Sequence, residues 1–275
     1  MKTRMTVGVA GLLGLIVTMS VHTAAQEVTP AQIMARSQEA FLAAGNDMVA
    51  RITMTLINKA GKERLRELTM LRKDLENGNQ RYFMYFHQPA DVRAMTFMVW
   101  KYPGRDDDRW LFVPAIKLVR RIAADDNRSS FVGSDFTYED VSGRDVNDDT
   151  HSLLREEKLA DRNCYVIQSV PKAAADYAKR VSWIDKENSL PLKEEYQDAQ
   201  GALFRVFTAD KVENITVGEG DKRQVLPTAT QRTMKNVKSG HRTEVKLSSV
   251  TYNVGLKDED FSERRMRRPP PEWTR

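Results

Sequence analysis

The segment Phe131–Val141, FVGSDFTYEDV, holds the residues best suited to chemistry. Ser134 and Asp135 follow a glycine, which raises the hypothesis of a serine nucleophile. A nucleophile elbow needs a second glycine, as in G-x-S-x-G, between a strand and a helix, and neither is present. The histidines that could complete a triad each lie at the end of an expected strand or in a turn, where a surface histidine is expected: His87, His151 and His241. The pattern therefore does not predict a serine hydrolase.

Acidic residues are the next candidates. The pairs Glu139–Asp140 and Glu194–Glu195 lie in segments expected to be extended, so the two carboxylates of each pair should point to opposite faces and cannot share one substrate. The aspartate clusters do not have the spacing of a calcium-binding EF-hand loop. A cysteine pair or H-x-x-x-H for zinc, a phosphate loop and a dinucleotide fingerprint are also missing from the sequence. We therefore expect no catalytic residue, no metal site and no cofactor, and not an enzyme.

The N-terminus predicts export. Lys2 and Arg4 precede an uncharged run, Met5–Ser20, which is shorter than the roughly 20 residues that span a bilayer. Small residues follow at Thr23 and Ala25, as signal peptidase requires. We expect a signal peptide over residues 1–25, cleaved near Ala25, and a periplasmic protein from residue 26 onward. Cysteine does not follow the run directly, so a lipid anchor is not expected.

The remaining composition narrows the class of partner. The 275 residues carry a formal net charge of +5, but the charges are interspersed and form no basic stripe with aromatic residues, so nucleic acid is not an expected partner. Residues 262–275 are basic and rich in proline. We interpret them as a frayed tail, with transient contact to a membrane surface as the alternative. Cys164, the single cysteine, is expected to be a buried apolar residue.

Hydrophobic periodicity predicts a protein that is mainly β with a few helices. Apolar and polar residues alternate in short runs from residue 47 onward, and Gly, Asn, Asp or Pro turns separate the runs. We expect about eleven strands in one large, curled antiparallel sheet, forming a single domain over residues 26–275. Thr29 and Pro30 begin a helix through residue 44. Shorter helices are expected at residues 171–178 and near the C-terminus.

Parts of this pattern resemble the LolA-like family of outer-membrane lipoprotein-sorting proteins. GSDFTYED within residues 131–141 is the specific part of the resemblance. Further segments follow in the same order: QPADVRAMTFMVWKYPGRDDDRWLFVPAIKLVRRIA, DKENSLPLKEEYQDAQGALFRVF and LKDEDFSERRMRR. The resemblance covers residues 30 to 268. One departure is Ala94, which stands where the family pattern has a glycine after the arginine.

The resemblance implies an open β half-barrel with lid helices that enclose an apolar cavity, and a segment 131–141 that is a structural corner. It also implies a periplasmic carrier that binds acyl chains of a lipid or lipoprotein and moves them between the inner and outer membranes, with an inner-membrane transporter as a candidate partner. We expect a monomer. The alternative is a non-catalytic module of the same fold that senses lipoprotein or binds a partner.

The candidate cavity residues are apolar side chains taken from alternate positions of the expected strands. The parity is open for YFMYF and MTFMVW, which are apolar on both faces, and packing in a plain core is the alternative for each residue. The candidates are Ile52, Met54, Leu56, Phe83, Tyr85, Phe97, Val99, Trp110, Phe112, Phe136 and Tyr138.

Overall fold

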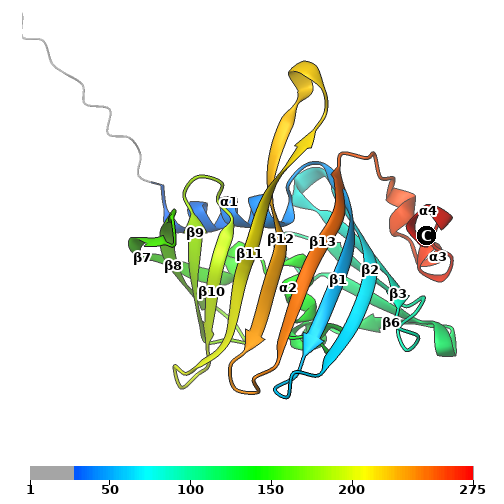
Figure 1. Cartoon of the computed structure of the whole chain (residues 1–275), viewed down its shortest axis with the longest axis horizontal. Coiled ribbons are helices and arrows are strands. Elements are labelled where there is room, and N and C mark those ends of the chain that lie inside the picture. The colour runs from blue at the N-terminus through cyan, green and yellow to red at the C-terminus, as the bar shows by residue number, and fades with distance from the viewer. Residues whose placement is uncertain (1–27, 275) are drawn as a thin grey trace, which may run out of the picture.

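A computed structural model describes residues 28–274, and its main element is a single antiparallel sheet of thirteen strands (Figure 1). The strands in chain order are β1 Asp47–Ile57, β2 Glu63–Asp74, β3 Gln80–Gln88, β4 Thr96–Lys101, β5 Asp108–Val113, β6 Leu118–Ile122, β7 Asp149–Leu159, β8 Arg162–Pro171, β9 Lys179–Asp185, β10 Pro191–Gln197, β11 Leu203–Val217, β12 Gln224–Asn236 and β13 Arg242–Tyr252. The predicted fold class, a large curled antiparallel sheet with few helices, is confirmed, with thirteen strands rather than about eleven.

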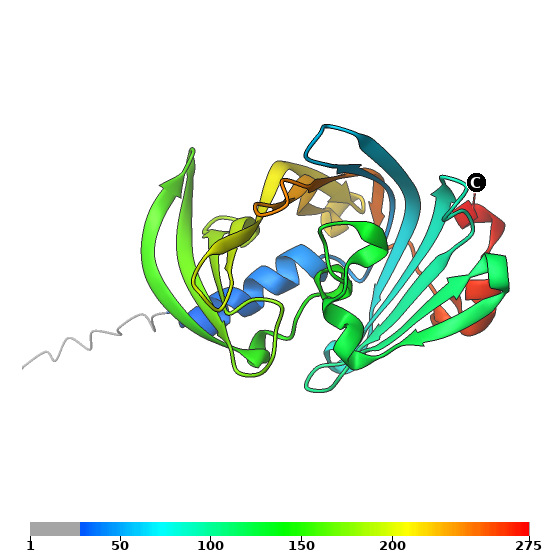
Figure 2. The ribbon, with the colours of Figure 1, turned by 90° about the horizontal axis from the view of Figure 1, so that it is seen from below.

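The chain enters this sheet in the middle. From β1 it runs outward by hairpins to the edge strand β6, crosses to the opposite edge at β7, and returns by hairpins to β13. Strand β13 then pairs with β1, with Met54 opposite Val245. The sheet curls without closing, because the two edges, β6 and β7, are at opposite ends of the strand order. Figure 2 shows the resulting trough.

Helix α1, Pro30–Leu42, lies across the concave side of this trough (Figure 2). It begins as the sequence predicts: Thr29 caps it, Gln32 completes a capping box, and Pro30 takes the first helical position. Its buried residues are Ile33, Met34 and Ser37, on one face. The other α-helices are α2 Tyr138–Ser142, α3 Glu263–Arg267 and α4 Pro271–Thr274.

Short 3-10 helices occupy the connections: η1 Glu76–Gly78, η2 Pro114–Ile116, η3 Ala124–Arg128, η4 Phe131–Gly133, η5 Val146–Asp148, η6 Gly220–Lys222 and η7 Asp258–Phe261. The expected helix at residues 171–178 is wrong, because Pro171 ends β8 and residues 172–178 form an irregular connection with bends before β9. Across residues 28–274, no helix is both long enough and apolar enough to cross a membrane. The expected signal peptide, residues 1–25, lies outside the described residues.

Both faces of the sheet are covered where its strands are apolar on both sides. The inner cluster includes Tyr82, Met84 and Phe86 of β3, and the outer cluster includes Phe83 of the same strand. Phe261, Met266 and Trp273 of the C-terminal end pack on the outer face. The expectation of a frayed tail over residues 262–275 is therefore wrong for residues 262–274, which the structure describes.

Hydrogen bonds fix this C-terminal cover to the sheet. Thr96 Oγ1 donates to the Met266 carbonyl at 3.1 Å, and Thr69 Oγ1 donates to the Trp273 carbonyl at 3.0 Å. The Trp273 ring lies 5.9 Å from the Phe83 ring, centroid to centroid. Because sheet side chains satisfy these buried carbonyls, α3 and α4 are integral parts of the fold.

Ala94, which stands where the family pattern has a glycine, adopts a backbone conformation that glycine favours. Its φ is 62°, in the left-handed region that glycine adopts without strain. Its amide donates to the Phe86 carbonyl at 2.8 Å, which closes the bend before β4. The alanine adds a Cβ to a conformation that disfavours one.

We predict that Trp273→Ala lowers the free energy of unfolding by about 3 kcal/mol, because it removes a buried aromatic ring from the outer cluster. Urea denaturation of the variant measures this. Glu272→Ala, at the exposed neighbouring position, is the control and should lie within about 0.5 kcal/mol of the parent. Equal stability of both variants would mean that the C-terminal end does not hold the outer face.

We predict that Ala94→Gly raises the free energy of unfolding by about 0.5 kcal/mol. Relief of left-handed strain exceeds the entropy that glycine adds to the unfolded chain. The control is Ala123→Gly, because Ala123 has an ordinary φ of −64° and is exposed. The control should lose stability through the unfolded-state entropy alone. A loss of stability in both variants would contradict the strain argument.

Candidate functional site: an apolar cavity beneath helix α1

A cavity of about 200 Å³ lies between α1, the crossing segment 123–148 and the concave face of the sheet. The sheet contributes mainly apolar side chains from β1 to β3, β12 and β13. These are Met48, Ile52, Met54, Leu68, Met70, Tyr82, Met84, Ala229, Met234, Val245, Leu247 and Tyr252. Helix α1 contributes Met34, Phe41 and Leu42, and the crossing segment contributes Phe131, Phe136 and Val141. Methionine recurs on three sides, and its flexible thioether suits a cavity that changes shape.

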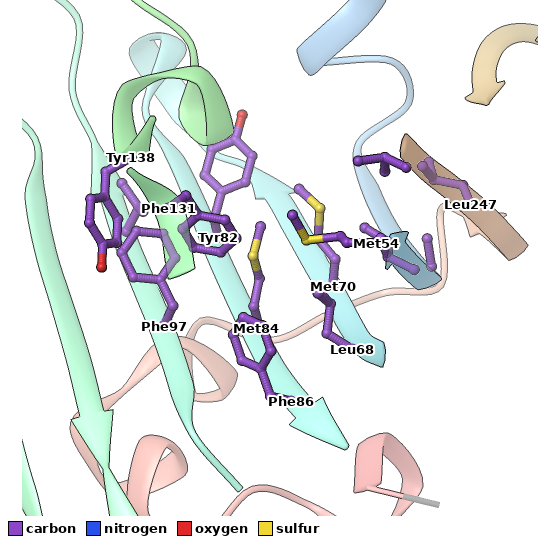
Figure 3. Packing of buried hydrophobic residues seen from close by; sticks show 14 of the residues in the cluster. Met54, Leu68, Met70, Tyr82, Met84, Phe86, Phe97, Phe131, Tyr138 and Leu247 are labelled. Carbon is purple, nitrogen blue, oxygen red and sulfur yellow. The ribbon is translucent and has the colours of Figure 1, made fainter. Parts of the chain in front are cut away.

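The close-up in Figure 3 shows how the neighbouring strands build the inner cluster. Met70 of β2 pairs with Met84 of β3, and Met84 pairs with Phe97 of β4. Phe131 and Tyr138 of the crossing segment each lie 5.3 Å from the Phe97 ring. This tilted aromatic packing fills the β4 side of the trough, so the cavity lies towards β1, β12 and β13.

The motif FVGSDFTYEDV thus belongs to the crossing segment, and its polar residues anchor it. Asp135 accepts a hydrogen bond from Thr243 Oγ1 at 2.8 Å and lies 2.6 Å from His241 Nδ1, and these contacts attach the segment to the start of β13. Ser134 Oγ contacts the backbone of Phe136 instead of a histidine. Gly133 makes the bend with a φ of +77°. The arrangement is that of a structural corner.

Glu139 and Asp140 do not lie in an extended segment, contrary to the expectation, because Thr137 caps α2 and Asp140 completes the capping box. Each carboxylate has its own arginine: Glu139 lies 3.3 Å from Arg144, and Asp140 lies 3.3 Å from Arg205. Burial raises the pKa of Glu139, and Arg144 opposes the rise. The Asp140–Arg205 pair ties the crossing segment to β11 in the second half of the sheet, whereas the Glu139–Arg144 pair lies within the crossing segment.

A charged network forms the polar end of the cavity. Asp149 accepts from Arg144 Nε at 2.9 Å and from the Tyr177 hydroxyl at 2.7 Å. Arg180 lies 3.8 Å from Asp149 and 3.5 Å from Glu194. Every carboxylate here is paired with an arginine, as buried charges usually are.

Arg72 holds the end of α1 together with Gln80 and Tyr82, whose Nε2 and hydroxyl donate to the Leu42 carbonyl at 3.3 Å and 3.4 Å. Arg72 of β2 donates from Nη1 to the Leu42 carbonyl at 3.0 Å and from Nη2 to the Gly45 carbonyl at 3.1 Å. Its guanidinium also pairs with Asp74 at 3.0 Å. These carbonyls have no partner within the helix, so Arg72 satisfies groups that the helix leaves open. Further along α1, Gln38 Nε2 donates to the Arg144 carbonyl at 2.8 Å.

The structure places the sequence-predicted cavity residues in three groups. Ile52, Met54 and Phe136 line the cavity. Leu56, Phe97, Val99 and Tyr138 are on the same face but lie in the packed cluster beside it. Phe83, Tyr85, Trp110 and Phe112 are on the opposite face, with the C-terminal helices, so the parity expected for β3 and β5 is wrong.

The loop after β2 gives the physical reason for the β3 error. A two-residue turn at Asn77–Gly78 would direct Phe83 and Tyr85 inward. The observed loop is centred on Asn77, which has a φ of 58°, and pairs Asp74 with Gln80. This shift by one position directs Tyr82, Met84 and Phe86 inward instead.

Sequence reasoning also missed lining residues outside the motif. Phe41 on α1 and Met234 on β12 line the cavity, and so do Val245 and Leu247 of β13. Periodicity alone could have assigned the alternating residues of β13 to one face, and its pairing with β1 would have made that face the inner one.

Metal binding and cysteine chemistry have little support among the described residues. Across residues 28–274, no group of three or more His, Cys, Asp or Glu residues could hold a metal ion. Cys164 is a buried free cysteine, as expected. Burial raises the pKa of its thiol, which disfavours the reactive thiolate.

We predict that Arg72→Met loosens α1. The change removes the arginine donors from the Leu42, Ala44 and Gly45 carbonyls and takes the cation away from Asp74, which should lower the free energy of unfolding by about 3 kcal/mol. Amide hydrogen exchange over residues 30–42 should become faster. Arg64→Met, at an exposed position of the same strand, is the control. Unchanged exchange in α1 would show that Arg72 does not hold the helix.

Comparisons with known proteins agree with this geometry. A structure of a DUF1329 family protein from Desulfovibrio piger is 27% identical, with a TM-score of 0.77 over 86% of this chain and 97% of that one. A domain assigned to outer membrane lipoprotein sorting, from Vibrio parahaemolyticus, is 28% identical, with a TM-score of 0.76 over 87% and 98%. A LolA superfamily protein from Nitrosomonas europaea, 21% identical over 86% and 99%, has a TM-score of 0.65 and shows the shared fold.

No curated protein sequence matches the chain. A family model described as "-like: Uncharacterized protein" matches residues 78–268, which is more than half of the chain. The chain therefore belongs to the family that this model describes, and the resemblance to lipoprotein-sorting proteins expected from the sequence is confirmed.

Proposed function

We propose that the protein is a periplasmic carrier that binds acyl chains of a lipid or lipoprotein in the cavity and moves them between the inner and outer membranes. The observation that carries the proposal is the methionine-rich cavity beneath α1. The expected signal peptide supports the compartment. The lipoprotein-sorting assignment of the Vibrio parahaemolyticus domain supports the class of cargo.

The energetics favour acyl chains. Each methylene buried away from water gains about 0.8 kcal/mol, so a chain of ten methylenes gains about 8 kcal/mol if the cavity accepts all of them. A carrier needs no catalytic group for this, because transfer of apolar surface supplies the free energy. The paired carboxylates at the polar end are consistent with a non-catalytic role.

The size of the cavity implies that α1 moves. Pockets for drug-sized ligands usually measure about 300 to 1,000 Å³, which is larger than the cavity of about 200 Å³ seen here. A lipid with two or three chains therefore needs α1 to shift outward. The buried residues of α1 are Ile33, Met34 and Ser37, so only one face of the helix has to leave the sheet when it shifts.

The edge strand β7 favours a second candidate, a partner-binding module. Leu153 and Leu154 of this strand are 41% and 45% exposed, and β7 pairs only with β8 among the described strands. An extended peptide could add to such an edge. A stable protein partner without bound lipid would favour this alternative.

We predict that the chain from residue 26 onward, purified from the periplasm without detergent, carries lipid. Native mass spectrometry with lipid extraction should detect phospholipid or acylated peptide. The uncharged fluorescent probe 1-N-phenylnaphthylamine should bind the delipidated protein. A lipid-free mass together with no probe binding would contradict the carrier proposal.

A matched pair of variants locates this binding. Met54→Trp puts a large ring into the cavity and should weaken probe binding by about tenfold, at a stability loss of about 1 to 3 kcal/mol. Thr53→Trp adds the same ring at the adjacent position of β1, which faces the outer side, and should leave probe binding unchanged. Thermal unfolding shows whether both variants fold.

A further inference from the structure

Arg232 of β12 is a charged residue in the wall of the apolar cavity. It lies on the same face of β12 as Met234, which is buried in the core. Burial lowers the pKa of Arg232 to about 10, and the guanidinium remains charged at neutral pH. The residue nevertheless keeps part of its accessible surface, and that surface lies at the cavity.

The guanidinium of Arg232 has no anionic partner among the described residues. Its Nε is buried without an acceptor, and neither a hydrogen bond nor an ion pair of this side chain occurs within residues 28–274. Its guanidinium contacts the ring of Phe41 on α1, whose centroid lies 5.0 Å away, and Tyr252 of β13 lies near enough to favour the charged form. A cation–π contact offsets part of the free-energy cost of desolvating the guanidinium. It does not accept hydrogen bonds from the N–H groups, which point outward in the guanidinium plane.

The other arginines of the cavity wall differ from Arg232. Arg72 pairs with Asp74, Arg144 pairs with Glu139 and Asp149, and Arg180 lies close to Glu194. Each of them is compensated within the protein. Arg232 therefore leaves an uncompensated positive charge in a cavity that is otherwise apolar on that side, where a methionine or leucine would pack more favourably.

We propose that Arg232 binds the anionic group of the cargo, a carboxylate or a phosphate, while the acyl chain fills the methionine-lined cavity. A planar guanidinium binds either group through two parallel hydrogen bonds. The inference rests on the proposed function, because it assumes that acyl chains enter this cavity. It adds that the preferred cargo is an anionic amphiphile and that a neutral lipid of equal chain length binds more weakly.

The site also links the cargo to α1. Phe41 contacts both the Arg232 guanidinium and the Phe207 ring, whose centroid lies 5.7 Å from its own. An anion on Arg232 would compete with Phe41 for the guanidinium, since both interact with the same cation. Cargo binding at this residue therefore acts on the helix that covers the cavity.

The test compares ligands that differ only in charge. Displacement of the uncharged probe 1-N-phenylnaphthylamine at pH 8 gives the affinities of oleate and of oleyl alcohol for the chain from residue 26 onward. Oleate should bind about tenfold more tightly than oleyl alcohol, as expected for one charge-assisted contact. Comparing the affinities of dioleoyl phosphatidic acid and dioleoylglycerol tests a phosphate group in the same way. Inorganic phosphate alone should not displace the probe.

Arg232→Gln should remove the preference for oleate and leave oleyl alcohol binding within about twofold. Lys235→Gln removes one positive charge from an exposed position of the same strand and should leave both affinities unchanged. Arg232→Lys should keep part of the preference. Arg232→Gln should also unfold at a temperature no lower than the parent, because it removes an uncompensated charge.

The outcomes separate the two proposals. Equal binding of oleate and oleyl alcohol to the parent protein overturns the anion site but leaves the carrier proposal intact. A preference for oleate that survives in Arg232→Gln also overturns it, because another group then binds the anion. Failure of the probe and of every lipid to bind contradicts the carrier proposal itself. If Arg232→Gln does not fold, the oleate and oleyl alcohol affinities of the parent protein and of Arg232→Lys still test the anion site.

Discussion

The fold depends on one constraint: a wide sheet with two apolar faces must be covered on both sides. Strands β2 to β5 carry large apolar side chains in both directions. The chain meets this constraint with its own ends and with the connection between the sheet edges. Helix α1 and residues 123–148 lie on the concave side, and the C-terminal helices lie on the convex side (Figures 1 and 2). The position of the cavity follows from this division.

The two covers differ in how completely they pack. On the convex side, Phe83, Phe261 and Met266 are almost fully buried, and sheet hydroxyls satisfy the carbonyls of the C-terminal helices. On the concave side, aromatic rings fill the region next to β4, while methionines line the space beneath α1. Dense packing on one face supplies stability, so the other face can keep a loosely filled space.

Sequence reasoning predicted the elements that local physics controls. The start of α1, the antiparallel hairpins and the corner at Gly133 all depend on capping, alternation and turn chemistry within a few residues. Sequence reasoning failed where contacts with a segment distant in the chain determine which side chains are buried. Trp273 makes the outer face of β3 a buried face, and a loop centred on Asn77 determines which β3 residues point inward. Arg232 could not be singled out, because an arginine in an alternating strand ordinarily faces solvent.

The proposed carrier function requires that the empty and loaded states have similar free energies. Acyl burial favours loading by about 0.8 kcal/mol per methylene, so ten methylenes alone would make release very slow. Closure of α1 over the empty cavity works in the opposite direction, because Phe41 and Met34 then bury against the sheet and Arg72 binds the helix end. Flexible methionines reduce the void that an empty rigid cavity would leave. In the proposed carrier, the helix that shields the cargo therefore also competes with it, and this competition would allow a tight apolar site to release its ligand.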